Sequence, residues 1–154
     1  MQFSFEARGL NELHDRFKAF PRKYSAAVSK TLQASLLILQ GSAPKYPARP
    51  AGSTYRRGGT LGRSLGTSMG GGKMGKPDIW EIKKREGFQE ARFGTQLGYA
   101  QYVVGDAATQ QARHMKHWWT VPQTLLTKAL PKITVAFEKL AAALAAYLDR
   151  NKQP

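Results

Sequence analysis

A segment rich in glycine and proline divides this chain of 154 residues into two parts that show ordinary apolar patterning. Between Gly41 and Pro77 the sequence has ten glycines and four prolines, but few large apolar side chains. Such a segment buries too little apolar surface to offset the entropy lost when it becomes ordered. We therefore predict a long loop here, so that helices and strands must come from the residues on either side.

The same segment belongs to a longer stretch that lacks acidic residues. Residues 16–77, 62 positions, contain no Asp or Glu and hold twelve of the 24 Lys and Arg, in a chain of net charge +14. Self-repulsion disfavours a compact state unless a partner supplies negative charge. The sequence therefore predicts a polyanionic partner: nucleic acid, an acidic protein surface or anionic lipid. The partner-binding residues that we expect lie in the loop: Lys45, Arg49, Tyr55, Arg56, Arg57, Arg63, Lys73 and Lys76.

The length of the chain predicts a single domain, 1–154, with a flexible basic arm at about 42–77. The chain has no cysteine, which excludes disulfides and thiolate metal sites. Its first residues carry a charge at Glu6 and have no apolar segment of the kind found in secretion signals. The longest apolar run, Leu140 to Leu148, is far shorter than the roughly 20 residues that span a bilayer. We therefore expect a soluble protein without membrane contact.

Apolar spacing before the loop predicts one strand and two helices. Phe3 and Phe5 alternate with polar residues, which is typical of a short half-buried strand. A short first helix is expected over Leu10–Phe20, and a second over Pro21–Gln40, where proline is tolerated in the first turn. The second helix has an apolar stripe with helical spacing, formed by Tyr24, Val28, Leu32, Leu36 and Leu39.

The residues after the loop predict a small antiparallel sheet. Strands are expected over Ile79–Ile82 and Phe88–Thr95, joined by a turn at Glu86–Gly87, and an edge strand is expected over Leu61–Met69. The run Tyr99–Val104 fits either a strand or a single helical turn, and Trp118–Val121 is a further extended candidate.

A long C-terminal helix completes the prediction. Its apolar stripe consists of Ile133, Phe137, Leu140, Leu144 and Leu148. We expect Pro131 near its start, with Gln123–Leu130 as a separate turn or kinked lead-in. The pattern is therefore α+β: two N-terminal helices, a long basic loop, a small antiparallel sheet and a long C-terminal helix.

No motif in the chain predicts catalysis, a cofactor or a metal. Gly70–Lys76 matches the spacing of a phosphate-binding loop, but Pro77 follows where a hydroxyl is needed, and neither a strand before nor a helix after is expected. His114 and His117 could share a helical face, yet zinc needs three or four ligands and no cysteine is present. No nucleophile elbow occurs. We therefore do not expect an enzyme.

The sparse carboxylates and the loop aromatics have other interpretations. Solvent-facing ion pairs with neighbouring Lys and Arg account for four acids: Asp78, Glu81, Glu86 and Glu90. Tyr46 and Tyr55 lie among basic residues of the loop, and such interleaving is used to bind single-stranded nucleic acid through stacking and phosphate contact. A nucleic-acid-binding protein that uses this Tyr- and Arg-rich arm is therefore the alternative hypothesis.

Several short motifs resemble one family of structural proteins. Ala43-Pro44 followed by Gly59-Thr60-Leu61-Gly62-Arg63-Ser64-Leu65 resembles the "AP … TG-x-L-x-x-S" stretch of the neck and tail-completion family of long-tailed phages. Tyr99–Gly105 is similar to the family's "YA-x-Y-V-E-x-G" element, and Gly9–Leu13 with Phe20–Lys23 is similar to its opening pair of helices. Two positions depart from the pattern: Gly59-Thr60 inverts the usual Thr-Gly, and Val104 replaces the usual Glu.

The resemblance implies a structural protein of the virion without catalytic residues or cofactors. It implies a ring, hexameric or dodecameric, around the DNA channel at the head–tail junction. The partners would be the head connector or head-completion proteins and the tail terminator or tube proteins, with non-specific contact to channel DNA. During assembly the protein would be in the host cytoplasm.

Overall fold

The computed structural model describes residues 2–5, 21–49, 51–54, 58–85, 88–106, 108–115, 118–120, 122 and 127–150. In chain order the elements are β1 (Gln2–Phe5), α2 (Pro21–Gly41), α3 (Thr60–Ser64), β2 (Ile79–Arg85), β3 (Phe88–Gly94), α4 (Ala100–Val104), α5 (Ala112–Met115) and α6 (Thr127–Arg150). The fold is α+β, with a small antiparallel sheet and a long C-terminal helix, as the sequence predicts.

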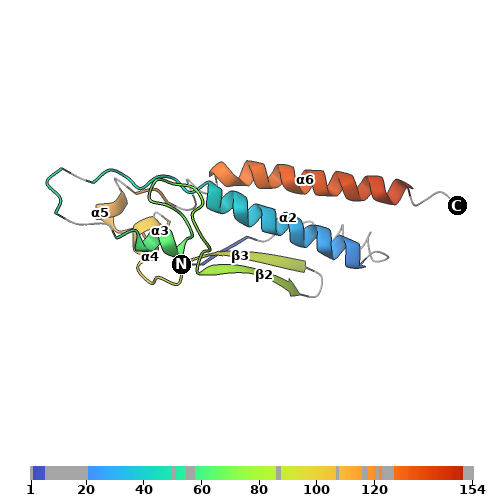
Figure 1. Cartoon of the computed structure of the whole chain (residues 1–154), viewed down its shortest axis with the longest axis horizontal. Coiled ribbons are helices and arrows are strands. Elements are labelled where there is room, and N and C mark those ends of the chain that lie inside the picture. The colour runs from blue at the N-terminus through green and yellow to red at the C-terminus, as the bar shows by residue number, and fades with distance from the viewer. Residues whose placement is uncertain are drawn as a thin grey trace.

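Helix α2 lies at the centre of the fold. It packs on α6 along one side and on β3 and β2 along the other, and the two long helices run antiparallel (Figure 1). All five residues of its predicted apolar stripe are buried: Tyr24, Val28, Leu32, Leu36 and Leu39. The helix extends to Gly41, one residue beyond the predicted end, and Pro44 follows. The 3.6-residue period therefore identified this helix and its buried face correctly.

The sheet has the strand order β1-β3-β2, and both pairings are antiparallel. In its register Phe93 lies opposite Phe3 on one side and opposite Trp80 on the other. Ala91 and Phe93 are buried against the core, and the rings of Trp80 and Phe93 meet edge to face with centroids 6.5 Å apart. The strands predicted at Phe3 and Phe5, at Ile79–Ile82 and at Phe88–Thr95 are thus confirmed.

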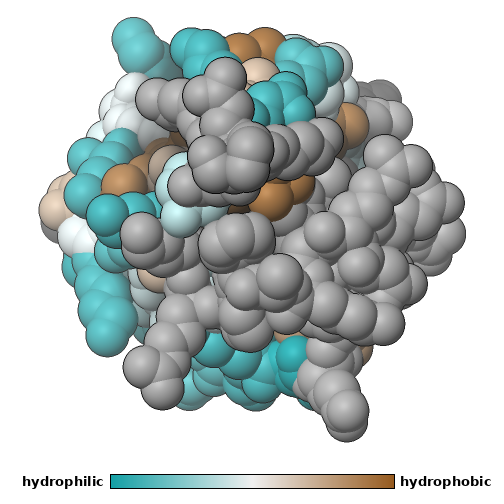
Figure 2. Space-filling view, turned by 90° about the vertical axis from the view of Figure 1, so that its right-hand side faces the viewer, coloured by the Kyte–Doolittle hydropathy of each residue, from teal (hydrophilic) through white to brown (hydrophobic). Residues whose placement is uncertain are grey.

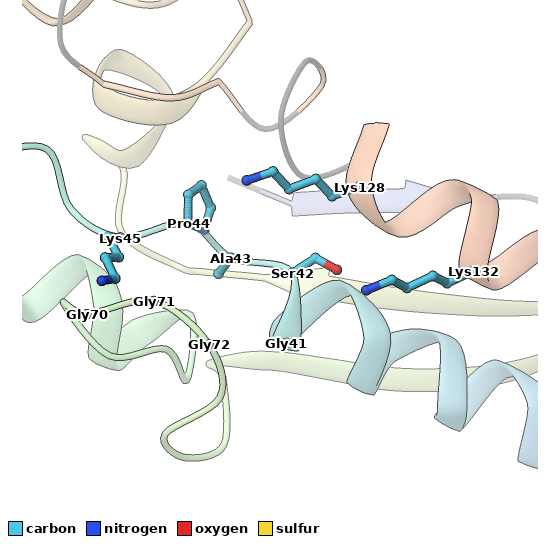
Figure 3. A pocket seen from close by; sticks show the side chains of 10 residues that line it. All are labelled: Gly41, Ser42, Ala43, Pro44, Lys45, Gly70, Gly71, Gly72, Lys128 and Lys132. Atoms are coloured by element: carbon cyan, nitrogen blue, oxygen red, sulfur yellow. The ribbon is translucent and has the colours of Figure 1, made fainter.

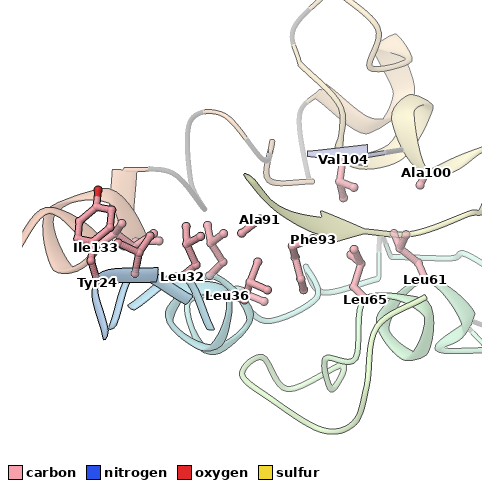
Figure 4. Close-up of a cluster of buried hydrophobic side chains, with 14 residues drawn as sticks. Tyr24, Leu32, Leu36, Leu61, Leu65, Ala91, Phe93, Ala100, Val104 and Ile133 are labelled. Atoms are coloured by element: carbon pink, nitrogen blue, oxygen red, sulfur yellow. The ribbon is translucent and has the colours of Figure 1, made fainter. Parts of the chain in front are cut away.

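The core continues from the long helices into the small ones. Leu32 and Leu36 of α2 are followed by Phe93, and then by Leu65 and Leu61 at α3 (Figure 4). Two residues of α4, Ala100 and Val104, close this end of the core. The run Tyr99–Val104, which fitted either a strand or a helical turn, is therefore a helical turn.

The predicted edge strand over Leu61–Met69 is wrong. The structure has helix α3 there, and Gly66 follows with a φ of 63°. The N–H groups of Gly66 and Thr67 donate to the carbonyls of Arg63 and Gly62, which is the Schellman arrangement that ends a helix at a left-handed glycine. Leu61 and Leu65 are both buried, because a spacing of four places them on one face of the helix.

Two further predictions need correction, and two others lie outside the described residues. Helix α6 begins at Thr127, so residues 127–130 belong to the helix, and residues 123–126 lie outside the described residues. Pro131 lies inside the helix, and its ring nitrogen cannot donate to the carbonyl of Thr127. Residues 118–120 form no strand. The expected first helix, Leu10–Phe20, and the turn at Glu86–Gly87 lie outside the described residues.

Helix α6 is less completely covered than α2. Ala129 and Ile133 are buried, whereas Phe137, Leu140, Leu144 and Leu148 are half-buried against the core. Leu130 and Val135 are exposed. Seen from the end where the C-terminus lies, brown apolar residues stand among teal polar ones at the top of the molecule, where α6 runs, and others lie nearer its middle (Figure 2). The predicted stripe of this helix is therefore confirmed, with weaker burial toward its end.

Candidate functional site

The glycine-rich segment consists of two parts with different arrangements. Residues 45–54 run out from the end of α2, past α5, to the end of the molecule opposite the C-terminus (Figure 1). Residues 60–77 form α3 and a glycine turn, and they fold back against α2 and the sheet. The arm predicted over 42–77 is therefore an extended loop only in its first part, and flexibility stays a prediction.

The glycine turn, residues 67–73, is held by its own hydrogen bonds. Thr67 and Lys73 pair in an isolated antiparallel bridge. The N–H of Ser68 donates to the carbonyl of Gly72 at 3.1 Å, and the N–H of Gly71 donates to the carbonyl of Ser68 at 3.0 Å. Gly71 and Gly72 have φ values of 91° and 72°, which residues with a side chain rarely adopt. The glycines therefore permit a compact turn here.

This turn is joined to the start of the extended loop. The N–H of Gly72 donates to the carbonyl of Ala43 at 3.0 Å, and the N–H of Tyr46 donates to the carbonyl of Met69 at 2.8 Å. A Cβ on Gly71 would lie 3.0 Å from the Ala43 carbonyl oxygen, so the two backbones approach as closely as glycine allows. Residues 43–46 and 69–72 therefore form one unit beside the end of α2.

Gln40 joins this unit to helix α2. Its side chain is fully buried, and its Nε2 donates to the carbonyl of Gly66 at 2.8 Å and to that of Gly75 at 2.6 Å. The two acceptors flank the glycine turn in sequence. One amide on the last turn of α2 thus holds both ends of that turn in place.

A hollow of about 530 Å³ lies where these parts meet the start of α6. We call it the basic pocket; its lining is Gly41, Ser42, Ala43, Pro44, Lys45, Gly70, Gly71, Gly72, Lys128 and Lys132. Lys128 and Lys132 extend from α6 toward Ser42 and Pro44, and Lys45 lies beside Gly70 and Gly71 (Figure 3). Three lysines line the pocket, and its lining, among the residues that the structure describes, includes no Asp or Glu.

The predicted partner-binding residues do not all lie in one place in the structure. Lys45 lines the basic pocket, whereas Arg49, Lys73 and Lys76 are exposed elsewhere along the segment. Arg63 is also exposed and donates a hydrogen bond to Thr60 Oγ1 at 3.3 Å. Within the described ranges, these five residues form no ion pair with a carboxylate. The other three predicted residues, Tyr55, Arg56 and Arg57, lie outside the described residues.

Sequence reasoning missed Lys128 and Lys132. They stand four residues apart, so they share one face of α6, and the first turn of that helix contains no acidic residue. A pair of lysines at the start of a helix, without a neighbouring acid, was visible in the sequence. Their position beside Lys45 was not visible, because it depends on how α6 packs on α2.

Tyr46 is half-buried and packs against the core. Its ring meets that of Trp118 edge to face with centroids 4.9 Å apart, and Trp118 in turn meets His114 at 6.3 Å. The contact with Trp118 restricts how a nucleic-acid base could stack on this ring. Tyr46 therefore gives weaker support to the interleaved aromatic and basic surface that the sequence predicts, and Tyr55 lies outside the described residues.

The motifs that resemble chemical sites lack the required context. Gly70–Lys76 lies between α3 and β2, so a phosphate-binding loop's preceding strand and following helix are both missing. Within the part of the chain that the structure describes, no three His, Cys, Asp or Glu residues gather to hold a metal. The described helices include none that is long and apolar enough to cross a bilayer.

The carboxylates on the sheet are paired as predicted in two cases. Glu81 contacts Lys83 at 2.9 Å, and Glu90 accepts a hydrogen bond from Arg92 at 2.6 Å. The hydrogen bond from Arg92, with the nearby positive charges, holds the pKa of Glu90 below its ordinary value. Asp78 was expected in an ion pair, but its Oδ2 instead accepts from Thr95 Oγ1 and the Gln96 N–H, both at 3.2 Å. Glu86 lies outside the described residues.

Comparison of the chain with protein-family models, with curated proteins and with solved structures found no match.

Proposed function

We propose that this protein is a structural subunit of a ring at the head–tail junction of a phage particle, where it joins the head connector to the tail. One observation of the structure supports this: the described basic residues of the segment 42–77 are exposed, and none forms an ion pair with a described carboxylate. Such a surface needs a negatively charged partner from outside the chain. The motif resemblance at Ala43-Pro44, Gly59–Leu65 and Tyr99–Gly105 supports the choice of this structural role.

The charge also restricts how copies of the chain would assemble. The protein carries a formal net charge of +14, so two copies repel each other wherever their basic surfaces meet. Ring contacts would therefore use other faces and leave the basic segment to a different partner. A hexamer or dodecamer arranged in this way presents its basic segments to channel DNA or to an acidic face of a neighbouring ring.

The alternative function is that of a free nucleic-acid-binding protein. The charge supports it, but the aromatic support is weaker because the ring of Tyr46 packs against Trp118. We propose no catalytic role for either function.

Composition and assembly of the particle test the proposal. Mass spectrometry of purified phage particles should detect the protein, and native mass spectrometry or electron microscopy should find a closed oligomer, alone or with connector or tail proteins. A protein that is absent from particles and stays monomeric with these partners would contradict the proposal.

A charge reversal tests the role of the loop. The double variant Arg56→Glu/Arg57→Glu should fold as the parent does, because loop charges contribute little to stability, and yet block head–tail joining in a complementation assay. Unfolding of the variant, seen by circular dichroism, would show instead that these residues are needed for the fold.

A further inference from the structure

The basic pocket brings together charges that come from distant parts of the sequence. Lys45 belongs to the extended loop, and Lys128 and Lys132 belong to the first two turns of α6. We propose that this pocket binds a phosphate group of a nucleic-acid backbone. The inference rests on the proposed function only in identifying the nucleic acid as the DNA that passes through the head–tail junction.

The placement of Lys128 and Lys132 opposes the stability of the free protein. The N-terminus of a helix carries partial positive charge, so acidic residues are favoured there and basic ones are not. Like charges four residues apart on a helix also repel each other. No acidic residue stands in the first turn of α6, and neither lysine forms an ion pair with a described residue. Local features that conflict with stability are expected at functional sites, and a bound anion would remove this conflict.

The wall opposite α6 leaves space for an anion, and the positive charge that attracts it comes from the lysines, because the N–H groups of Gly71 and Gly72 already donate to the carbonyls of Ser68 and Ala43. Gly70, Gly71 and Gly72 place no side chain between the backbone and the pocket (Figure 3). The hydrogen bond from Gly72 to Ala43 and the two bonds from Gln40 hold this wall in place without a ligand. The pocket is therefore formed in advance, so that an anion need not order the loop when it binds.

The lining cations favour an anion that is bound through charge and not through a fixed geometry. Arginine binds carboxylates and phosphates alike with two parallel hydrogen bonds, and no arginine is among the described residues that line the pocket. Lysine supplies a compact point charge, which suits phosphates that pass with little sequence preference. A pocket lined by lysine and glycine is therefore expected to contact the backbone of DNA and to ignore its bases.

The experiment compares two triple variants with equal loss of charge. The pocket variant is Lys45→Gln/Lys128→Gln/Lys132→Gln. The matched control is Lys30→Gln/Lys84→Gln/Lys139→Gln, which removes three exposed lysines outside the pocket. Binding to a duplex of about 20 base pairs is measured by fluorescence anisotropy across a series of salt concentrations, because counterion release makes the affinity depend on salt.

The pocket variant should bind DNA about tenfold more weakly than the parent near 0.1 M salt, whereas the control should change by less than about threefold. If the three lysines share one phosphate, the slope of log affinity against log salt should fall by about one in the pocket variant; three separate phosphates would lower it by about three. The pocket variant should also melt about 1 °C higher than the parent, because the repulsion between Lys128 and Lys132 is removed.

Two results would overturn the inference. Equal losses of DNA affinity in both variants would show that the net charge acts without a site. Retained DNA binding in the pocket variant, with lost binding to polyglutamate, would show that the pocket recognises carboxylates. If the triple variant fails to fold, Lys132→Gln alone replaces it, with an expected loss of about threefold and with the same two outcomes.

The result is distinguishable from a failure of the proposed function. If the protein is absent from phage particles but the pocket variant loses DNA affinity, phosphate binding in the pocket is supported and the structural role in the ring is contradicted. If the protein is present in particles and joins heads to tails while both variants bind DNA equally, the structural role in the ring is supported and phosphate binding in the pocket is contradicted.

Discussion

Replacement of Gly66 by alanine should destabilise the protein strongly. Gly66 has a φ of 63°, a conformation that costs a residue with a Cβ about 1–2 kcal/mol. The new Cβ would also collide with Gln40 Nε2 and would lie 2.5 Å from the Gly75 carbonyl oxygen. Gln40 would have to move, and its two hydrogen bonds, each worth about 0.5–1.5 kcal/mol, would be lost. The sum is about 2–5 kcal/mol.

Urea unfolding followed by circular dichroism measures this loss. With a slope of about 2 kcal/mol per molar urea, the midpoint should fall by roughly 1–2.5 M. Gly75→Ala is the matched control, because no atom lies within 4 Å of its added Cβ and its φ is not positive. The control should leave the midpoint unchanged or raise it. Any gain in the free energy of unfolding should be at most about 1 kcal/mol.

A loss below about 0.5 kcal/mol in Gly66→Ala would refute the reasoning. It would mean that the loop adjusts without strain and that Gln40 does not hold the glycine turn. A loss of similar size in both variants would refute it as well, because the two sites differ only in conformation and in neighbouring atoms.

Two further predictions concern the core and the sheet. Leu36→Ala should lower the free energy of unfolding by about 2–5 kcal/mol, because the side chain is 0% exposed. Leu37→Ala is the control and should lower it by less than about 1 kcal/mol, because that side chain is 40% exposed. Equal urea midpoints for the two variants would contradict the packing of α2. Glu90→Gln should reduce stability above the ordinary glutamate pKa of about 4.3, since the pKa of Glu90 is lowered by Arg92 in the folded protein. The difference from the parent should vanish as the pH falls through the folded pKa, and a difference that persists in acid would show that the ion pair is not its cause.

The pattern of apolar residues was sufficient to predict an element where one period continues along a long segment of the chain. Tyr24, Val28, Leu32, Leu36 and Leu39 repeat at helical spacing, so the buried face of α2 followed directly from the sequence. The strands β2 and β3 were expected from the short apolar run Ile79–Ile82 and from the turn signal that precedes Phe88–Thr95. The observed β2 continues to Arg85, three residues beyond the predicted end.

Short elements were predicted less well, because a run of a few residues fits both a strand and a helical turn and its packing in the fold decides between them. The apolar run Leu61–Met69 predicts a strand, whereas Leu61, Leu65 and Gly66 have the spacing of a helical turn that ends at a glycine, and the structure has that turn. The run Tyr99–Val104 was too short to decide. In both cases burial against the end of the core determined the outcome.

The sequence by itself determined the chemistry of this protein: a large positive charge, a basic segment without acids, and long helices with one apolar face. It did not determine which charges would meet. Lys45 shares a pocket with Lys128 and Lys132 because α6 packs antiparallel on α2 and Gln40 holds the glycine turn beside them. Patterns along a chain report on neighbours a few residues apart, whereas contacts between distant segments are decided by packing.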